Sequence, residues 1–320
     1  MTGTVLPGLA EIRAAAVRIA PHARRTPVWR SRSLDEWLGV EIRLKCENLQ
    51  RVGAFKFRGA CNAVFSLTAE EAARGVATHS SGNHAQALAL AARLRGVPAH
   101  VVMPHTAPAV KRNAVAGYGA RIIPCEPTLE AREAALAEVT AATGALFIPP
   151  YNDVRVIAGQ GTAALELLEA APDLEILLAP VGGGGLLSGT AIAAAALSPG
   201  CKVFGAEPAA ADDAARSLAA GRIIPSVNPR TVADGLRTSL GDLTFAAIRA
   251  HAAGIVTVSE EGIVEAMRRV WERVKLVIEP SAAVPVAALL EHRGRFQGAR
   301  VGVILSGGNV DLDRLPWGAG

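Results

Sequence analysis

The sequence has few aromatic residues, few lysines and few cysteines, and it has no long tract of one charge. Only 4% of its 320 residues are aromatic, and the formal net charge is +4. Its arginines are scattered and do not form a basic tract with interleaved aromatics, which argues against nucleic acid as a partner. The four cysteines form no CxxC pair and no His/Cys cluster at zinc spacing. We therefore expect reduced thiols and neither disulfides nor a zinc site.

Apolar runs typical of a leader or a membrane anchor are also missing. Glu11 and Arg13 interrupt the N-terminal stretch where a signal peptide would be apolar, so a cytoplasmic location is predicted. The segment 176–201 has no charged residue and is long enough to span a bilayer. Pro180 and the glycines at 182–185 would break such a helix, and we expect a buried strand, a glycine loop and an alanine-rich helix there.

The rest of the chain has the pattern of an α/β protein large enough for two domains. From residue 74 onward, short apolar strands alternate with Ala/Leu-rich helices, which predicts right-handed crossovers and parallel sheets covered on both faces. The first series predicts strands at 76–79, 99–103, 121–124 and 146–149, with helices at 84–95, 107–117 and 129–143. The second predicts strands at 176–179, 202–206, 255–258 and 300–305, with helices at 161–170, from 186, at 260–277 and at 282–292.

These series predict two open parallel-sheet domains with the active site in the cleft between them. We expect the N-terminal segment to join the second sheet, which makes the larger domain discontinuous. The predicted boundaries are 1–72 and 151–320 for the large domain and 73–150 for a small mobile domain.

One of the five lysines has unusual neighbours. Lys56 lies between Phe55 and Phe57, just ahead of a predicted helix. Apolar neighbours and a helix N-terminus disfavour the ammonium form and leave a neutral amine that can attack an aldehyde. A solvated lysine at the start of a surface helix is the alternative.

The tetraglycine segment Gly182–Gly185, followed by Leu186, lies between a predicted strand and a predicted helix. Exposed backbone N–H groups and the helix dipole suit a phosphate dianion. The segment lacks the Lys-Ser/Thr ending of a nucleotide-triphosphate loop and the spaced glycines of a dinucleotide fingerprint. A tight interdomain turn is the other interpretation.

Two further polar segments follow predicted strands. Residues 78–84 (THSSGNH) lie at the position where parallel sheets bind ligands, and their N–H groups and hydroxyls suit an α-carboxylate. A capped helix start at Ser80 or Ser81 is compatible with this use. The SGGN segment at 306–309 on its own indicates only a turn.

Taken in chain order, these segments resemble the fold-type II (β-family) pyridoxal-phosphate enzymes, which have a tryptophan synthase β-like fold. The likeness is greatest to serine/threonine dehydratases and serine racemase. It rests on KCENLQ (45–50), GAFKFRGA (53–60), SSGNHAQ (80–86), VIAGQGT (156–162), VGGGGLLSG (181–189), GAEP (205–208), VWERVKLVIEPSAA (270–283) and SGGNVDL (306–312).

The resemblance implies a role for each cofactor-binding position. Lys56 would hold pyridoxal 5'-phosphate as an imine, and Phe55 would pack beside its ring. Asn83 would bind the ring hydroxyl, and Ser306 would face the pyridine nitrogen. The phosphate would be held by Gly182, Gly183, Gly184, Gly185 and Leu186.

The resemblance also implies a substrate site. Ser80, Ser81, Gly82, Asn83 and His84 would hold the substrate, with Lys56 taking its α-proton. Ser81 would face the opposite side of the α-carbon, which is the position for reprotonation in a racemase. Arg132 would bring a guanidinium to a substrate carboxylate upon closure, and Tyr151 would line the side-chain pocket.

A metal site is implied at 207–213. Glu207, the carbonyl of Ala211 and Asp213 resemble the divalent-cation ligands of metal-activated members, and oxygen ligands indicate Mg²⁺ or Ca²⁺. Two solvated acids beside a helix start are the alternative.

The predicted activity is that of a dehydratase, which converts a small β-hydroxy amino acid such as L-threonine or L-serine to a 2-oxo acid and ammonia. A serine racemase with dehydratase side activity, or a dehydratase of 3-hydroxyaspartate or of the hydroxyectoine pathway, is the alternative. Ala54 stands where the family often has Ser, which alters one contact near the cofactor. No C-terminal regulatory domain is expected, and a homodimer is the predicted assembly.

Overall fold

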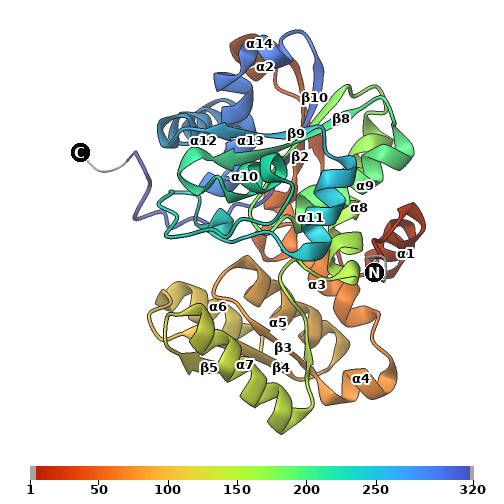
Figure 1. Cartoon of the computed structure of the whole chain (residues 1–320), viewed down its shortest axis with the longest axis vertical. Coiled ribbons are helices and arrows are strands. Elements are labelled where there is room, and N and C mark those ends of the chain that lie inside the picture. The colour runs from red at the N-terminus through yellow and green to blue at the C-terminus, as the bar shows by residue number, and fades with distance from the viewer. Residues whose placement is uncertain (1–4, 318–320) are drawn as a thin grey trace.

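The computed structural model describes residues 5–317, and two parallel sheets organise it (Figure 1). The large sheet consists of β1 (Val28–Trp29), β2 (Glu41–Cys46), β7 (Ile176–Pro180), β8 (Lys202–Pro208), β9 (Gly254–Val258) and β10 (Arg300–Leu305). Its strand order is β1-β2-β10-β7-β8-β9, and only β1 runs antiparallel to its neighbour. The N-terminal strands therefore lie in the same sheet as the C-terminal half of the chain.

Helices cover both faces of the large sheet, because successive side chains along its strands are apolar and point to opposite faces. Leu177 packs into one core and Leu178 into the core on the opposite face. The core of Leu178 includes residues of α2 (Arg32–Leu38), α12 (Glu260–Val274), α13 (Pro280–Glu291) and α14 (Arg293–Phe296). The core of Leu177 includes residues of α8 (Val154–Ala170), α9 (Gly185–Leu197), α10 (Asp213–Ala220) and α11 (Asp242–His251). On the outside, α1 (Leu9–Ile19) packs against α8 and α9.

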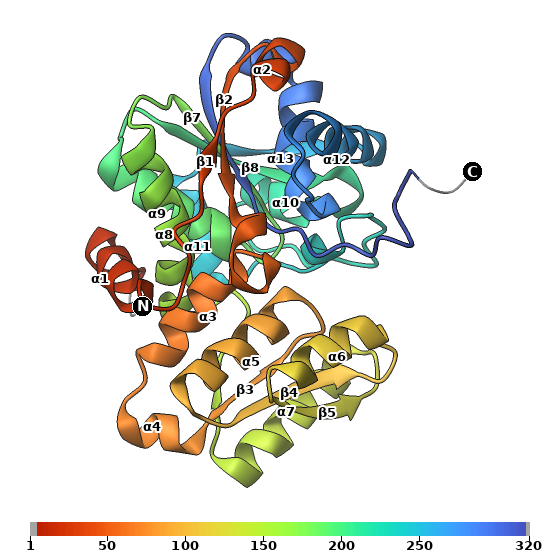
Figure 2. The same ribbon diagram turned by 180° about the vertical axis from the view of Figure 1, so that it is seen from behind.

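The small sheet is built from the middle of the chain (Figure 2). Its strands, in the order β5-β4-β3-β6, are β3 (Val76–His79), β4 (Ala99–Pro104), β5 (Arg121–Cys125) and β6 (Leu146–Phe147). One face packs against α5 (Asn83–Arg95) and α6 (Ala109–Gly117), and the other against α7 (Leu129–Thr143). Helix α3 (Lys56–Phe65) shares a core with α5 and α8, and α4 (Ala69–Arg74) leads into β3. Since α3 contacts layers of both sheets, the residue at its start lies at their junction.

The predicted α/β class with two parallel sheets is confirmed. Many predicted bounds differ from the observed ones by one or two residues, and three ends have a clear physical cause. The predicted strand 146–149 ends at Phe147: Ile148 donates one more hydrogen bond, to Ala77, and Pro149 and Pro150 then have no N–H to continue the pairing. The helix predicted at 161–170 begins at Val154, because the Asp153 carboxylate caps its first turn. The helix predicted at 260–277 ends at Val274, because Lys275 is left-handed with a φ of 63°.

The predicted domain boundaries remain a prediction. The topology places β1 and β2 with β7 to β10, and β3 to β6 apart from them. Residues 1–4 and 318–320 of the predicted large domain lie outside the described residues.

Within residues 5–317, no helix has both the length and the apolar character needed to cross a membrane. The uncharged segment 176–201 forms β7, the glycine loop and α9, and most of it is buried. Its lack of charge therefore reflects burial inside the large α/β layers.

Candidate active site

A cavity of about 960 Å³ lies between the two sheets, where strands β3, β7 and β10 end. The carboxyl edge of parallel strands is the usual place for ligands in such folds. Every predicted cofactor-binding and substrate-binding residue lines this cavity: Phe55, Lys56, Ser80, Ser81, Gly82, Asn83, His84, Arg132, Tyr151, Gly182, Gly183, Gly184, Gly185, Leu186 and Ser306. The structure thus brings these residues together, and their individual roles remain predictions. The predicted metal ligands lie outside it.

Lys56 is the first residue of α3, and its amine is poorly solvated. Its Nζ donates a hydrogen bond to the carbonyl of Pro150 at 2.7 Å and lies 5.2 Å from the centroid of the Phe55 ring. Loss of water lowers the pKa of Lys56 to about 8, and the nearby Glu279 charge opposes that shift. An appreciable fraction of this amine is therefore neutral near pH 7, as a nucleophile toward an aldehyde must be.

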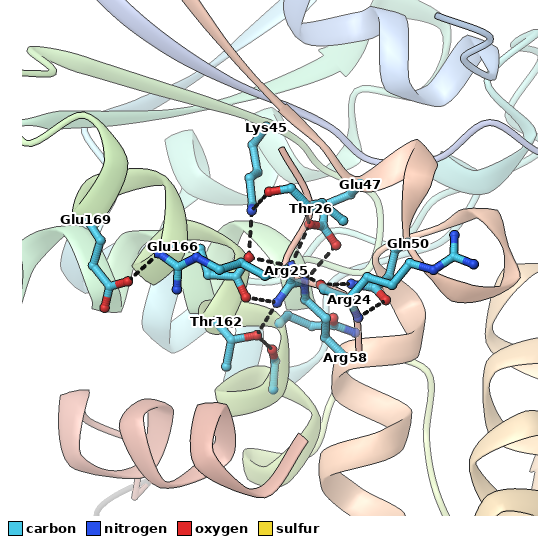
Figure 3. Close-up of polar contacts among 12 residues, drawn as sticks. Arg24, Arg25, Thr26, Lys45, Glu47, Gln50, Arg58, Thr162, Glu166 and Glu169 are labelled. Carbon is cyan, nitrogen blue, oxygen red and sulfur yellow. Dashed lines mark hydrogen bonds and ion pairs between the residues drawn. The ribbon is translucent and has the colours of Figure 1, made fainter. Parts of the chain in front are cut away.

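A buried ionic cluster holds α3 in place (Figure 3). The Arg58 guanidinium is fully buried. It donates hydrogen bonds to the carboxylates of Glu47 at 2.7 Å and Glu166 at 2.8 Å. Glu166 also accepts a hydrogen bond from Lys45 at 2.6 Å. Because these partners come from β2, the turn after it and α8, the cluster ties the helix that carries Lys56 to the large sheet.

The glycine loop connects β7 to the N-terminus of α9. A Cβ built at Gly183 would lie 2.2 Å from the Tyr151 ring, and one at Gly182 would lie 2.9 Å from the Cα of Leu236. Gly184 has a φ of +87°, which other residues rarely adopt. Side chains are therefore excluded from this loop, which leads directly into the N-terminus of α9, and a glycine loop at a helix N-terminus suits a phosphate.

The segment after β3 places polar groups opposite the glycine loop. Asn83 begins α5, and its side chain is hydrogen-bonded at both ends, to Glu279 and to Asn309. The ring of His84 is buried, and its Nε2 lies 3.0 Å from the carbonyl of Ile148. Burial lowers the pKa of His84 to about 3, so the ring is neutral and Nε2 donates to that carbonyl.

Ser306 and Tyr151 form further parts of the wall. Ser306 is buried at the end of β10, and its carbonyl accepts a hydrogen bond from the backbone N–H of Phe55 at 2.9 Å. The Tyr151 hydroxyl lies 3.1 Å from the Thr238 hydroxyl, within hydrogen-bond distance. This pair closes one side of the cavity beside the glycine loop.

Arg132 comes from α7, on the side of the small sheet. Its Nε is buried without a hydrogen-bond partner among the described residues. Within residues 5–317, its guanidinium forms no ion pair with a carboxylate. An unpaired guanidinium in a cavity is a binding group for an anion.

The predicted metal ligands Glu207 and Asp213 lie at the end of β8 and the start of α10. The Glu207 carboxylate accepts hydrogen bonds from the backbone N–H groups of Ala214 and Ala215, both at 2.9 Å. Burial raises the pKa of Glu207 to about 8 and that of Asp213 to about 6. Neither Asp213 oxygen has a hydrogen-bond partner among the described residues. Two neighbouring buried acids with raised pKa values, of which Asp213 has unpaired oxygens, would fit a divalent cation.

No group of three or more His, Cys, Asp or Glu residues suited to a metal occurs within residues 5–317. The cation would therefore need the Ala211 carbonyl and water to complete its coordination.

Sequence reasoning assigned no role to several residues that line the cavity, among them Thr238, Glu279 and Asn309. Glu279 lies in the segment 270–283, one of those that resemble the family. An acid that follows an apolar run and precedes a proline at a helix start could have been predicted to be buried. Thr238 had no comparable sign, because its contact to Tyr151 joins residues far apart in the chain.

The chain is similar to known proteins over nearly its whole length. A family model described as "Pyridoxal-phosphate dependent enzyme" matches residues 19–307. The chain is 52% identical to the beta-hydroxyaspartate dehydratase of Paracoccus denitrificans (strain Pd 1222), covering 98% of this chain and 99% of that protein. It is 50% identical to the L-threo-3-hydroxyaspartate ammonia-lyase of Saccharomyces cerevisiae, covering 97% and 95%. The solved structure of serine racemase from Dictyostelium discoideum is 49% identical with a TM-score of 0.92, covering 95% and 99%.

Proposed function

The chain belongs to the pyridoxal-phosphate dependent enzymes and is a lyase of fold-type II, and on that premise we propose that it dehydrates a β-hydroxy amino acid that carries a second carboxylate. The substrate class is 3-hydroxyaspartate, and the products are a 2-oxo acid and ammonia. L-threonine and L-serine, which have no second carboxylate, would be poorer substrates.

The residues present fit the cofactor. Lys56 would hold its aldehyde, the N–H groups of the glycine loop its phosphate, and Asn83 its ring hydroxyl. When bound, the cofactor supplies an electron sink for the charge left on the substrate α-carbon. The poorly solvated Lys56 amine suits the other task, because its pKa of about 8 lets Nζ accept and return a proton near neutral pH.

The substrate needs two anion sites, and two sets of anion-binding groups line the cavity. Residues 80–84 present backbone N–H groups and hydroxyls for the α-carboxylate. The observation that carries the proposal is the unpaired guanidinium of Arg132, which suits the side-chain carboxylate of 3-hydroxyaspartate. The names of the two relatives with that substrate support the same class.

A substrate panel with an arginine variant tests this proposal. We expect 3-hydroxyaspartate to have a higher kcat/KM than L-serine or L-threonine. Loss of one charge-assisted contact in Arg132→Met should lower kcat/KM for 3-hydroxyaspartate by roughly 10- to 100-fold and change that for L-serine much less. Arg121→Met, at an exposed position of β5, is the matched control. Equal losses for both substrates would instead assign Arg132 to the α-carboxylate.

Racemisation is a second candidate activity, and the position of Ser81 favours it. Its hydroxyl lines the same cavity as Lys56, so a proton removed by Lys56 could be replaced from Ser81. We expect D-serine to form from L-serine, and Ser81→Ala to abolish that inversion while β-elimination continues. Wild-type enzyme that eliminates without forming any D-serine contradicts this assignment.

The cation site is a separate proposal. We infer that Mg²⁺ or Ca²⁺ binds the oxygens of Glu207, Ala211 and Asp213 and serves the fold, because this site lies outside the cavity. Metal-stripped protein should regain thermal stability on addition of either ion, by about 2.7 kcal/mol at 100 times the Kd. Asp213→Asn should remove this response, whereas Asp212→Asn, whose carboxylate pairs with Arg216 on the surface, should keep it.

A further inference from the structure

Glu279 is a buried acid in the cavity wall with no role in the proposals above. It precedes α13, and its residue surface is only 5% exposed. A Cβ built at Gly307 would lie 2.5 Å from its Oε1, so the SGGN turn leaves room for this carboxylate. Burial of a carboxylate costs free energy unless hydrogen bonds compensate for the lost water, so its contacts should reveal its role.

The Glu279 carboxylate contacts the side chain of Asn83. The Asn83 amide donates from Nδ2 to Oε1 at 3.0 Å and to Oε2 at 3.2 Å. At its other end, Asn83 Oδ1 accepts a hydrogen bond from Asn309 Nδ2 at 2.9 Å. The amide therefore has an acceptor on its donor side and a donor on its acceptor side, and a flip would place like groups against each other.

Asn309 extends this chain of contacts to the turn before Lys56. Its Nδ2 also donates to the carbonyl of Val52 at 2.7 Å. Val52 has a φ of 55° and Gly53 a φ of 68°, so this turn has a conformation that needs external support. The contacts thus join α13, α5, the turn after β10 and the turn before α3, and they cross from the large sheet to the small one.

Three charged groups face the Glu279 carboxylate across the cavity. Lys56 comes from α3, and the Glu279 charge raises its pKa. Lys111 of α6 and Asp234 of the turn Asp234–Leu236 pair with each other at 2.8 Å. Asp234 raises the pKa of Glu279 and Lys111 lowers it, while burial is the largest cause of a rise to about 7. Glu279 therefore lies in the electrostatic environment of the lysine that holds the cofactor.

We propose that Glu279 is a positioning residue of the active site, which together with Asn309 fixes the orientation of the Asn83 amide that would bind the cofactor ring hydroxyl. The inference rests on the role of Asn83 toward the ring hydroxyl and does not depend on which amino acid is the substrate. Only an acceptor without N–H groups satisfies this place, because Asn83 Nδ2 donates to both oxygens of the Glu279 carboxylate. A glutamine there has one acceptor and adds a donor.

The test compares Glu279→Gln with Glu291→Gln, a variant at the other end of α13 whose carboxylate contacts Ser259 on the surface. For Glu279→Gln we expect the Kd of pyridoxal 5'-phosphate to rise by roughly 10- to 100-fold and the visible absorbance and circular dichroism of the bound cofactor to change. Glu291→Gln should change neither. A purely structural role for Glu279 predicts a lower melting temperature of the apoprotein with an unchanged spectrum of the bound cofactor, and that result would overturn the proposal.

A double-variant comparison shows whether Glu279 acts through Asn83. If it does, Glu279→Gln should have almost no further effect on the cofactor Kd or spectrum once Asn83→Ala is present. Additive effects of the two substitutions contradict the proposal. If Asn83→Ala alone leaves Kd and spectrum unchanged, the role assigned to Asn83 fails, which distinguishes that failure from a failure at Glu279.

Asn309→Ala covers the case in which Glu279→Gln does not fold, because Asn309 is exposed and its loss removes only the contact to the acceptor end of Asn83 and that to Val52. We expect the same change in the cofactor spectrum. An unaltered spectrum in this variant would contradict the fixed-amide arrangement.

Discussion

At the scale of single residues, the chemistry of this site depends on groups whose charge is changed by burial. Lys56 illustrates how far the sequence reaches: its apolar neighbours predicted a lysine with a disfavoured ammonium form, and the structure lowers its pKa to about 8. The acid that opposes this shift, Glu279, lies more than two hundred positions further along the chain. No local pattern predicts that pairing, because only the folded sheets bring the two residues together.

The lowered pKa of Lys56 predicts the pH dependence of cofactor capture. Neutral amine is the reactive form, so the rate at which apoprotein captures pyridoxal 5'-phosphate should rise about tenfold per pH unit below pH 8 and level off above it. Stopped-flow absorbance between pH 6 and 10 measures this, with borohydride reduction to trap the lysine adduct. Lys56→Ala should give no trapped adduct, and Lys202→Ala, at an exposed position, should behave as wild type. A midpoint near 10.5 would mean that the amine is fully solvated.

At the scale of elements, the periodicity of the sequence predicted most strands and helices, and end effects caused the errors. The strand at 300–305 and the helix at 129–143 have their predicted bounds, because long patterned segments with clear caps determine them. The early start of α8 depends on one capping carboxylate, that of Asp153. The ionic cluster that holds α3 was not predictable from spacing, since Lys45, Arg58 and Glu166 belong to three separate elements.

That cluster predicts an unequal response of two arginines to the same substitution. Arg58→Leu leaves the Glu47 carboxylate buried without its cationic partner and Glu166 with Lys45 alone, so the free energy of unfolding should fall by about 3–5 kcal/mol. Arg25→Leu is the matched control, because its pair with Glu169 is largely exposed and should contribute less than about 1 kcal/mol. Urea denaturation of the two variants measures the difference. Equal shifts of the two midpoints would contradict the role given to the buried cluster.

At the scale of the whole molecule, the active site exists only where the two sheets face each other. The sequence predicted a cleft between two sheets, and the residues predicted to bind cofactor and substrate do line one cavity. What the sequence did not reveal is how the two sides contact each other across that cavity. Among the described residues, the polar contacts that do so include Asn83 with Glu279, Asn83 with Asn309 and Lys111 with Asp234. Each joins side chains that are more than one hundred positions apart.

The Lys111–Asp234 pair predicts a closure effect that stability measurements alone would miss. Both side chains are partly exposed, at 34% and 50%, so breaking the pair in Asp234→Asn should change the free energy of unfolding by less than about 1 kcal/mol. We propose that the two sides of the cleft close on the substrate, and the same loss should then weaken apparent substrate affinity by up to about fivefold, since closure and binding would share one equilibrium. KM measured at low and high salt checks this, because screening should weaken wild type toward the variant. Lys111→Met should raise KM as much as Asp234→Asn does, and the double variant should raise it no further. An unchanged KM in all three variants would mean that the pair does not contribute to closure.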